Sequence, residues 1–584
     1  MAKVLLANPC GPYPHAWGED VLDFFGSRLS RAQGVFTFTS HSHCWALYMI
    51  AENINASTTV LEYSHLDEFE EELKNNYDYV GIQIIGIYTP IVAKMVESVR
   101  RVSPGSKVVI GGYGVAGLDD PVPHDPEDYA GYVLNNADYI CREEGVRFFR
   151  RLLDDPPHER PITQFHMPMG GTTIKGFDFL PPAPVPTILV ALGCTGGCEF
   201  CNTSAFFKAQ KIVVADPDEC YSFMSAAMNR IPRFNGAPPP INMTLFDEDL
   251  LLDKDYVLRL GRNMREGGLI GETGYFCFAS IKSVSQFDLD ELAACGMDTV
   301  WIGVESTYEK VVSQDHKFIK RGGNELSEVF KGLHDRGIST VASFILGLDF
   351  QTPENIEQDI ASLVAMRPVM YQIAPYTPCP GTRFYQRVKK EGRLLPEYTW
   401  SDIQIWKDDV YRTKNFPLGE LRKVFDKTHD ELMRHNGPTV LNMHNVALSG
   451  YERYRNDHRV HYQRRAEYLA RKAQKSYAAL KTVKEFAATQ EVRDKVDELE
   501  KRYIRLLGQP DLGQKFVREL MLRVMRRQKR LTEQGLTDVA SDPPVRWTYY
   551  SPGDTAPPKV VRRMRKRPSR LKILSKPIQL VANL

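Results

Sequence analysis

The sequence lacks long hydrophobic runs, is poor in cysteine and carries almost no net charge. No apolar stretch in its 584 residues approaches the roughly 18 residues that span a bilayer, which excludes a polytopic membrane protein. Ten cysteines are too few for a disulfide scaffold, and the short apolar run near the N-terminus does not suit a signal peptide. With 43% hydrophobic and 25% charged residues, the chain is neither disordered nor fibrous. We therefore expect a cytoplasmic protein of two or three domains with reduced thiols.

The net charge of +1 hides a basic C-terminal segment. From Lys559 to the end the chain has nine Lys and Arg residues and no acid, and removing them leaves the rest of the chain at −8. We expect residues 536–584 to form a flexible basic tail. Such a tail can contact an anionic membrane surface at the periphery or an acidic partner, whereas nucleic acid is not expected.

Residues 1–160 alternate buried strands with helical patterns. Short apolar runs at 3–7, 79–85 and 107–112 are typical of buried strands, and residues 90–101 carry apolar side chains at helical spacing. This alternation predicts a parallel, doubly wound α/β sheet of Rossmann-like type. Such sheets bind ligands at the carboxyl ends of their strands.

The remainder of the chain divides by composition. Residues 161–186 are rich in proline and glycine and read as a linker, and residues 187–400 repeat strand–helix units, which favours a full or partial (β/α) barrel. The expected strands of this barrel are 187–192, 241–246, 275–278, 299–302 and 341–346. Residues 401–535 carry apolar side chains three and four apart and predict a helical domain. We interpret that stripe as core packing, with a membrane- or partner-binding face as the alternative.

Three cysteines lie within eight residues, directly after a predicted strand. Cys194, Cys198 and Cys201 are spaced CxxxCxxC on a loop that contains glycine, so their thiolates can reach one metal centre. Zinc would need a fourth ligand nearby, and the next cysteine, Cys220, stands alone. Three cysteines suit a [4Fe–4S] cluster with one open iron. A zinc site completed by a distant residue is the alternative.

This cysteine motif, with Phe200 before its last cysteine, resembles that of radical S-adenosylmethionine (radical SAM) enzymes. Four further segments, at 246–249, 301–306, 344–349 and 376–382, resemble elements of that family in the same order. The resemblance implies that the open iron chelates S-adenosylmethionine, whose cleavage gives a 5′-deoxyadenosyl radical. The residues that it implies for binding S-adenosylmethionine are Phe200, Asp247, Asp249, Glu305, Ser306 and Gly347.

The subgroup with these elements usually carries a cobalamin-binding domain before the barrel, and residues 1–160 resemble it. The resemblance implies a cobalamin site that includes Gly81, Thr89, Gly111 and Gly112. It is weaker at residues 142–145, which read Arg-Glu-Glu-Gly where the subgroup tends to have a G-E-G-E-like turn.

One loop of the N-terminal region offers a candidate cobalt ligand. Many cobalamin domains use a D-x-H-x-x-G loop, and here His15 and Gly18 fit that pattern while Tyr13 replaces the aspartate. The carboxylate that would orient the imidazole is therefore missing. His15 is a candidate ligand, and a loop histidine with another role is the alternative.

The family resemblance implies an enzyme that methylates an unactivated carbon, using the radical and methylcobalamin. A cobalamin-dependent cyclase or oxidase-type reaction and a non-catalytic cobalamin or iron–sulfur sensor are the alternatives. A methylthiotransferase would need extra cluster cysteines in the first domain, which has only the widely spaced Cys10, Cys44 and Cys141.

The substrate is open to a small molecule, a lipid or a peptide, and the radical chemistry implies an external electron donor of flavodoxin or ferredoxin type. Cys379, in the Thr-Pro-Cys-Pro-Gly-Thr segment, is a candidate catalytic residue that could donate a hydrogen atom or carry a covalent intermediate. The alternative for this thiol is a buried small hydrophobe.

Overall fold

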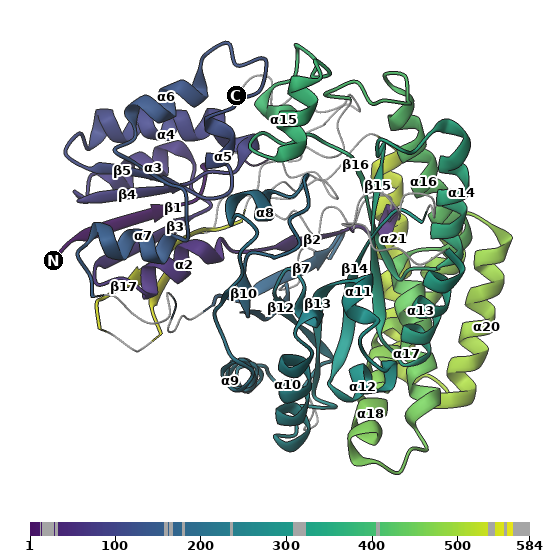
Figure 1. Cartoon of the computed structure of the whole chain (residues 1–584). Coiled ribbons are helices and arrows are strands. Elements are labelled where there is room, and N and C mark those ends of the chain that lie inside the picture. Colours follow the sequence, from purple (N-terminus) through teal and green to yellow (C-terminus); the bar gives the residue numbers. More distant parts are fainter. Residues whose placement is uncertain are drawn as a thin grey trace.

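The computed structural model combines two mainly parallel sheets with a C-terminal set of helices (Figure 1). It describes residues 1–11, 13, 29, 33–156, 162, 167–177, 182–233, 238–307, 323–403, 409–534, 543–553 and 557–563.

The N-terminal sheet has the strand order β18-β17-β3-β1-β4-β5-β6. Its parallel strands are β1 (Lys3–Ala7), β3 (Ser57–Glu62), β4 (Tyr79–Gln83), β5 (Lys107–Gly111) and β6 (Tyr139–Cys141). The helices of this region are α2 (Trp45–Glu52), α3 (Leu66–Leu73), α4 (Thr89–Val102), α5 (Val115–Leu118), α6 (Tyr129–Asn136) and α7 (Gly145–Leu152). The prediction of a doubly wound sheet is confirmed, and the strand order reverses between β1 and β4.

The second sheet is a partial barrel. Its strands run β16-β15-β14-β13-β12-β9, and each is parallel to its neighbours. They are β9 (Thr187–Leu189), β12 (Ile241–Phe246), β13 (Thr273–Ser280), β14 (Met297–Glu305), β15 (Ser339–Leu346) and β16 (Met370–Pro375). The helices are α8 (Asn202–Phe206), α9 (Pro217–Asn229), α10 (Lys254–Glu266), α11 (Ile281–Val284), α12 (Leu289–Ala294), α13 (Gly323–Asp335), α14 (Pro353–Ala365) and α15 (Arg383–Lys390). Buried aliphatic and aromatic side chains between strands and helices make one large core, which confirms the barrel prediction.

The segment expected as a linker contributes strands of its own. β7 (Gly170–Ile174) pairs antiparallel with both β2 (Phe38–His41) and β8 (Ala183–Val185). Residues 172–174 read Thr-Thr-Ile, a β-branched run that favours extended structure. Residues 161–186 are therefore more than a connection, because this small sheet ties them to residues near position 40.

The expected flexible tail also needs correction where it is described. β17 (Val545–Tyr550) adds antiparallel to the edge strand β3, and β18 (Lys559–Arg563) pairs with β17. The Trp547 indole N–H donates to Glu72 Oε2 at 2.9 Å, which fixes the added strand against α3. The physical reason is the β-branched and aromatic composition of residues 545–550, which covers an otherwise open sheet edge.

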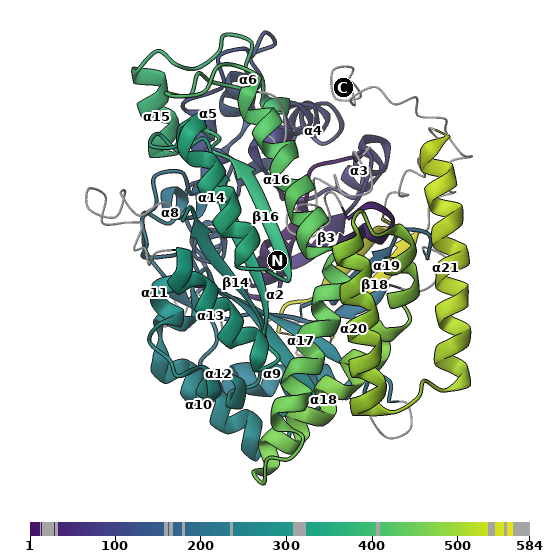
Figure 2. The same ribbon diagram turned by 90° about the vertical axis from the view of Figure 1, so that its right-hand side faces the viewer.

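The prediction of a helical C-terminal region is confirmed. Its helices are α16 (Glu420–Asn436), α17 (Thr439–Tyr454), α18 (Val460–Tyr477), α19 (Leu480–Phe486), α20 (Gln490–Leu507) and α21 (Leu512–Glu533). Figure 2 shows them stacked beside the barrel, with α21 at the outer side. The backbones of Gly337 and Gly450 approach so closely that a Cβ on either would meet the other or Leu469.

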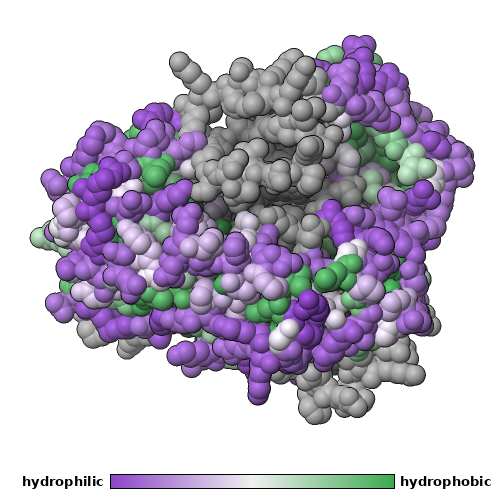
Figure 3. Space-filling model, turned by 90° about the horizontal axis from the view of Figure 1, so that it is seen from above, coloured by the Kyte–Doolittle hydropathy of each residue, from purple (hydrophilic) through white to green (hydrophobic). Residues whose placement is uncertain are grey.

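The surface seen from above is mostly hydrophilic where it is described, with apolar residues in small groups (Figure 3). None of the described helices combines the length and the apolar character that a membrane span needs.

Candidate functional site

The three cysteines of the CxxxCxxC motif lie on the loop between β10 (Ala191–Leu192) and α8. All three thiols are half-buried. Gly193 takes a φ of +77°, where a side chain would collide with Phe207 and the backbone of Gln210. This glycine therefore permits the tight turn that leads from the strand into the loop.

The donor set of this loop fits an iron–sulfur cluster. The Gly196 N–H donates to Cys194 Sγ at 3.2 Å, so the backbone is already turned toward sulfur. Burial raises the pKa of the Cys194 thiol, and the charge of Glu248 adds to that rise. Among the described residues no three His, Cys, Asp or Glu side chains are gathered around one ion site. Three thiols on one loop are the protein donors that a cluster with one open iron takes.

The acidic segment after β12 contains two buried aspartates, Asp247 and Asp249, with partners in neighbouring elements. Asp247 is buried and pairs with Lys211 at 2.7 Å, and Asp249 accepts from the Ser283 hydroxyl at 2.6 Å and the Ser280 N–H at 3.1 Å. Both predicted residues are therefore engaged in holding the end of the strand. Burial raises the pKa of the Asp249 carboxyl.

Glu248, which no feature of the sequence singles out, is the member of this segment that contacts the helix after the cysteine loop. Its Oε1 accepts from the Thr203 hydroxyl at 3.1 Å, and Thr203 lies on α8 just after Cys201. Burial raises the pKa of Glu248, and the neighbouring charge of Asp247 adds to the rise.

A buried network joins two of the predicted residues, Ser306 and Gly347. Asp359 accepts from the Ser306 hydroxyl at 2.7 Å and the Gln351 side-chain N–H at 2.9 Å, and also from Thr307. Gln351 Oε1 in turn accepts from the Gly347 N–H at 2.7 Å. The ends of β14 and β15 are thereby locked together.

The end of β14 is also strained. Glu305 has a φ of +61°, and the pairing of β14 with β15 shifts register between residues 303 and 305. A positive φ is uncommon outside glycine and clusters at functional sites.

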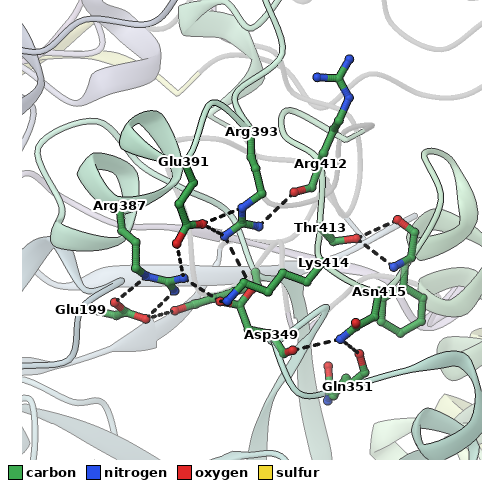
Figure 4. Close-up of polar contacts among 12 residues, drawn as sticks. Glu199, Asp349, Gln351, Arg387, Glu391, Arg393, Arg412, Thr413, Lys414 and Asn415 are labelled. Carbon is green, nitrogen blue, oxygen red and sulfur yellow. Dashed lines mark hydrogen bonds and ion pairs between the residues drawn. The ribbon is translucent and has the colours of Figure 1, made fainter.

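A half-buried ion network around Asp349 reaches the cysteine loop at Glu199 (Figure 4). Arg387 on α15 pairs with Glu199, between Cys198 and Cys201, at 2.9 Å and with Asp349 at 2.6 Å. Lys414 pairs with Asp349 at 2.9 Å.

Aromatic contacts reinforce this network. The Tyr376 hydroxyl donates to Glu199 at 2.7 Å, and the predicted residue Phe200 meets the Tyr376 ring edge-on at 5.8 Å. The Tyr376 ring stacks on Phe384 at 3.7 Å. Phe200 thus takes part in holding the loop against α15.

Cys379 lies in the turn that precedes α15 and is half-buried. Its carbonyl accepts from the Thr382 hydroxyl at 2.7 Å, and its side chain packs on the apolar core of the N-terminal region. The same turn touches α5, because a Cβ on Gly381 would collide with Ala116 and one on Gly117 would lie 2.9 Å from Pro380. Cys379 therefore sits at the boundary between the two sheets.

The glycines predicted for cobalamin have neighbours within the N-terminal region itself. A Cβ on Gly81 would meet Leu6 at 2.6 Å, so this position in β4 serves strand packing. Gly112 has a φ of +109° and lies against the Ile84 carbonyl, and Gly111 lies against Cys141.

Of the two remaining candidates for cobalamin, one can be placed. Thr89 is buried and donates to the Gly86 carbonyl at 2.7 Å. His15 lies outside the described residues.

Aromatic contacts bring the carboxyl edge of the N-terminal sheet to the barrel. Tyr113, after β5, meets Phe206 of α8 at 5.4 Å, and Trp45 of α2 meets Phe246 of β12 at 5.2 Å. These aromatic residues were not predicted from the sequence, because each belongs to an ordinary strand or helix end.

Buried Glu62 is a further group at this edge. It accepts from Cys44 N at 2.7 Å and pairs with His43 Nδ1 at 2.7 Å. Burial by itself would raise the pKa of Glu62, but the charge and hydrogen bond of His43 and the hydrogen bond from Tyr48 bring it below its usual value.

Comparison with known proteins assigns the barrel. Residues 188–363 match the family model described as the Radical SAM superfamily. The chain therefore carries a radical SAM domain and is a radical SAM enzyme, which confirms the predicted [4Fe–4S] cluster and S-adenosylmethionine.

Two curated relatives are named as methyltransferases. The bacteriochlorophyllide d C-8(2)-methyltransferase of Chlorobaculum tepidum is 22% identical over 336 residues, which cover 55% of this chain and 70% of the relative. An uncharacterized methyltransferase of Pyrococcus horikoshii is 20% identical over 292 residues, 48% of this chain and 58% of the relative.

Solved structures with similar folds include two radical SAM enzymes. The radical S-adenosylmethionine methyltransferase TsrM of Kitasatospora setae, with cobalamin and a [4Fe–4S] cluster bound, gives a TM-score of 0.48 at 13% identity and covers 82% of this chain and 100% of its own. The cobalamin-dependent S-adenosylmethionine radical enzyme OxsB gives 0.41 at 12% identity and covers 93% of this chain and 82% of its own.

Proposed function

We propose that the chain is a cobalamin-dependent radical SAM methyltransferase that methylates an unactivated carbon. The observation that carries this proposal is the contact between the carboxyl edge of the doubly wound sheet and the cysteine loop of the barrel. Tyr113 meets α8, which follows Cys201 directly, and α5 meets the turn before α15. A ligand held at the edge of the first sheet is therefore next to a ligand held by the loop.

The strand order supports a cofactor at that edge. Sheets of this order bind flat ligands in the crevice where the order reverses, here between β1 and β4. The methyltransferase names of the curated relatives support methyl transfer. When bound, the cluster, S-adenosylmethionine and cobalamin supply a 5′-deoxyadenosyl radical and a transferable methyl group.

The residues of the chain position these groups. Cys194, Cys198 and Cys201 would hold the cluster, and the pairing of Glu199 with Arg387 fixes the loop between the last two. The Glu248 carboxylate contacts Thr203 on α8, just after the cysteine loop, and Glu305 stands at the strained end of β14. Both can accept hydrogen bonds from a bound polar ligand.

Other reactions of the same site remain alternatives. A cyclase or oxidase-type reaction would use the radical without methyl transfer, and a sensor would bind the cofactors without turnover. The proposed enzyme takes electrons from an external flavodoxin- or ferredoxin-type donor, and its substrate is a small molecule, a lipid or a peptide.

The test is an anaerobic incubation of the reconstituted protein with S-adenosylmethionine, cobalamin and a low-potential reductant. We expect both 5′-deoxyadenosine and S-adenosylhomocysteine, the latter only when cobalamin is present. Deoxyadenosine alone would favour the cyclase or oxidase reading. If neither product forms while the absorbance shows an intact cluster, the result would favour the non-catalytic sensor.

A cysteine variant sharpens this test. Cys198→Ala removes one of three cluster ligands, so we expect loss of cluster absorbance and a fall of both products to background. Cys220→Ala is the matched control, since that thiol is buried on α9 and its removal should leave cluster and products in place. Equal product from Cys198→Ala and the parent protein would contradict the proposed cluster site.

A further inference from the structure

Helix α21 presents two different faces. Leu522, Met525 and Gln528 are buried on the side that packs on α18, α19 and residues 34–36. On the other side Leu512, Phe516 and Leu520 follow one another at intervals of four and are 83%, 68% and 39% exposed. This spacing places the three apolar side chains in one line along the outer surface of the helix.

The apolar line continues as a basic line in the second half of the helix. Arg523, Arg527 and Arg530 are exposed at intervals of four and three, which extends the same stripe. The whole helix has seven Lys and Arg residues against two Glu residues.

Three of the other four basic side chains of the helix are already paired. Arg518 pairs with Glu500, Arg526 with Glu485 at 2.5 Å and Lys529 with Glu533 at 3.8 Å. The three arginines of the stripe form no ion pair with any residue in the described part of the chain. Their charge is therefore available to an outside partner.

We propose that α21 is an interfacial helix that docks this protein onto an anionic lipid bilayer. The outer stripe would lay Leu512, Phe516 and Leu520 into the acyl boundary, while the unpaired arginines meet lipid phosphates. A helix of 22 residues is about 33 Å long, so it can lie along the membrane plane. The stripe combines exposed apolar side chains with positive charge. An anionic bilayer offers acyl chains to the former and phosphate groups to the latter.

Other occupants match the stripe less well. A nucleic acid would pair with the arginines but leave the exposed Phe516 and Leu520 in water. A second copy of the chain would bring the same positive charge to the same face. Helix α21 is also separate in sequence from the basic segment that begins at Lys559, so the contributions of the two to membrane binding can be measured separately.

The experiment measures co-sedimentation of the full-length protein with phosphatidylcholine–phosphatidylglycerol vesicles and with pure phosphatidylcholine vesicles. We expect binding to the anionic vesicles, at least tenfold weaker binding to the neutral ones, and weakening by salt. The combined variant Leu512→Ser, Phe516→Ser, Leu520→Ser should reduce binding at least tenfold. The combined variant Arg523→Gln, Arg527→Gln, Arg530→Gln should abolish the preference for anionic lipid.

The matched control is Val460→Ser, which removes a 60% exposed apolar side chain at the start of α18. It should bind as the parent protein does, and unchanged thermal unfolding of all variants would show that they are folded. No binding by the parent protein would overturn the proposal. Binding that the serine variant retains but that truncation after Pro558 removes would also overturn it, because the basic tail would then be the membrane contact. A parent protein that is a dimer and binds no vesicles, with a monomeric serine variant, would overturn it in favour of a contact between two copies of the chain.

Discussion

Two polar networks flank the same short segment, residues 347–351, and they are built differently. On one side Asp359 is buried and accepts from neutral hydroxyl and amide donors of Ser306, Thr307 and Gln351. On the other side Asp349 is half-buried and is surrounded by cations, chiefly Arg387 and Lys414 (Figure 4). The buried network depends on hydrogen-bond geometry, whereas the outer network depends on charge and is screened by solvent.

The largest effect is expected from the buried network. Asp359→Asn replaces an oxygen acceptor by an N–H donor that faces other donors, so at least one buried hydrogen bond is lost. We expect a loss of about 2–3 kcal/mol in the free energy of unfolding, measured by urea denaturation. Binding of S-adenosylmethionine to the cluster-loaded protein should weaken as well, because Ser306 and Gly347 lose their common support.

The matched control for this variant is Asp335→Asn. Asp335 is exposed and pairs with Lys331 within helix α13, so its change should stay within about 0.5 kcal/mol. Equal stability of the two variants would mean that the buried network contributes no more than a surface pair.

A smaller effect is expected from the outer network. Arg387→Met keeps most of the side-chain length but leaves Glu199 and Asp349 without their shared partner. Because these groups are half-buried, we expect a loss of about 1–2 kcal/mol in the free energy of unfolding. Iron should also leave the reconstituted protein faster on incubation with a chelator, since the loop at Glu199 is released.

Arg422→Met is the control for that variant, because Arg422 pairs with Asp426 on the exposed side of α16. It should change neither unfolding nor iron release. If Arg387→Met lost iron no faster than Arg422→Met, the outer network would not hold the cysteine loop in place.

The parts of this protein that can be predicted from sequence are those marked by neighbouring residues. The buried strands, the helix periods and the cysteine loop each depend on residues close in the chain, and their positions agree with the structure. Asp359 and Arg387 carry no such mark, because their partners lie 53 and 188 residues away. An aspartate within a helix, or an arginine in a basic helix, looks like a surface residue until the fold brings its partner.

Strand β17 illustrates the same limit at the level of the fold. Its partner β3 lies nearly five hundred residues earlier, and only the open edge of that strand gives residues 545–550 a place to pair. Within the acidic segment after β12 the sequence indicated carboxylates but not which one faces the loop. That choice depends on side-chain direction, and the Glu248 carboxylate is the one that accepts a hydrogen bond from Thr203 on α8.

The smallest predicted effect distinguishes the two networks by pH. Burial alone would raise the pKa of Glu199 and of Asp349, but the hydrogen bonds from Arg387 and Tyr376 to the former, and from Lys414 and Arg387 to the latter, lower both below their usual values. A carboxyl whose pKa is lower in the folded state stabilises the fold fully above its unfolded pKa, about 4, and loses this contribution as pH falls through the folded pKa. The stability difference between the parent protein and Arg387→Met should therefore shrink by about 1 kcal/mol when urea midpoints are compared at pH ~7 and pH ~3.5. A difference that stays constant over this range would show that Arg387 acts by packing its stem against Phe384, whose ring centroid lies 5.1 Å from its guanidinium, rather than by its charge.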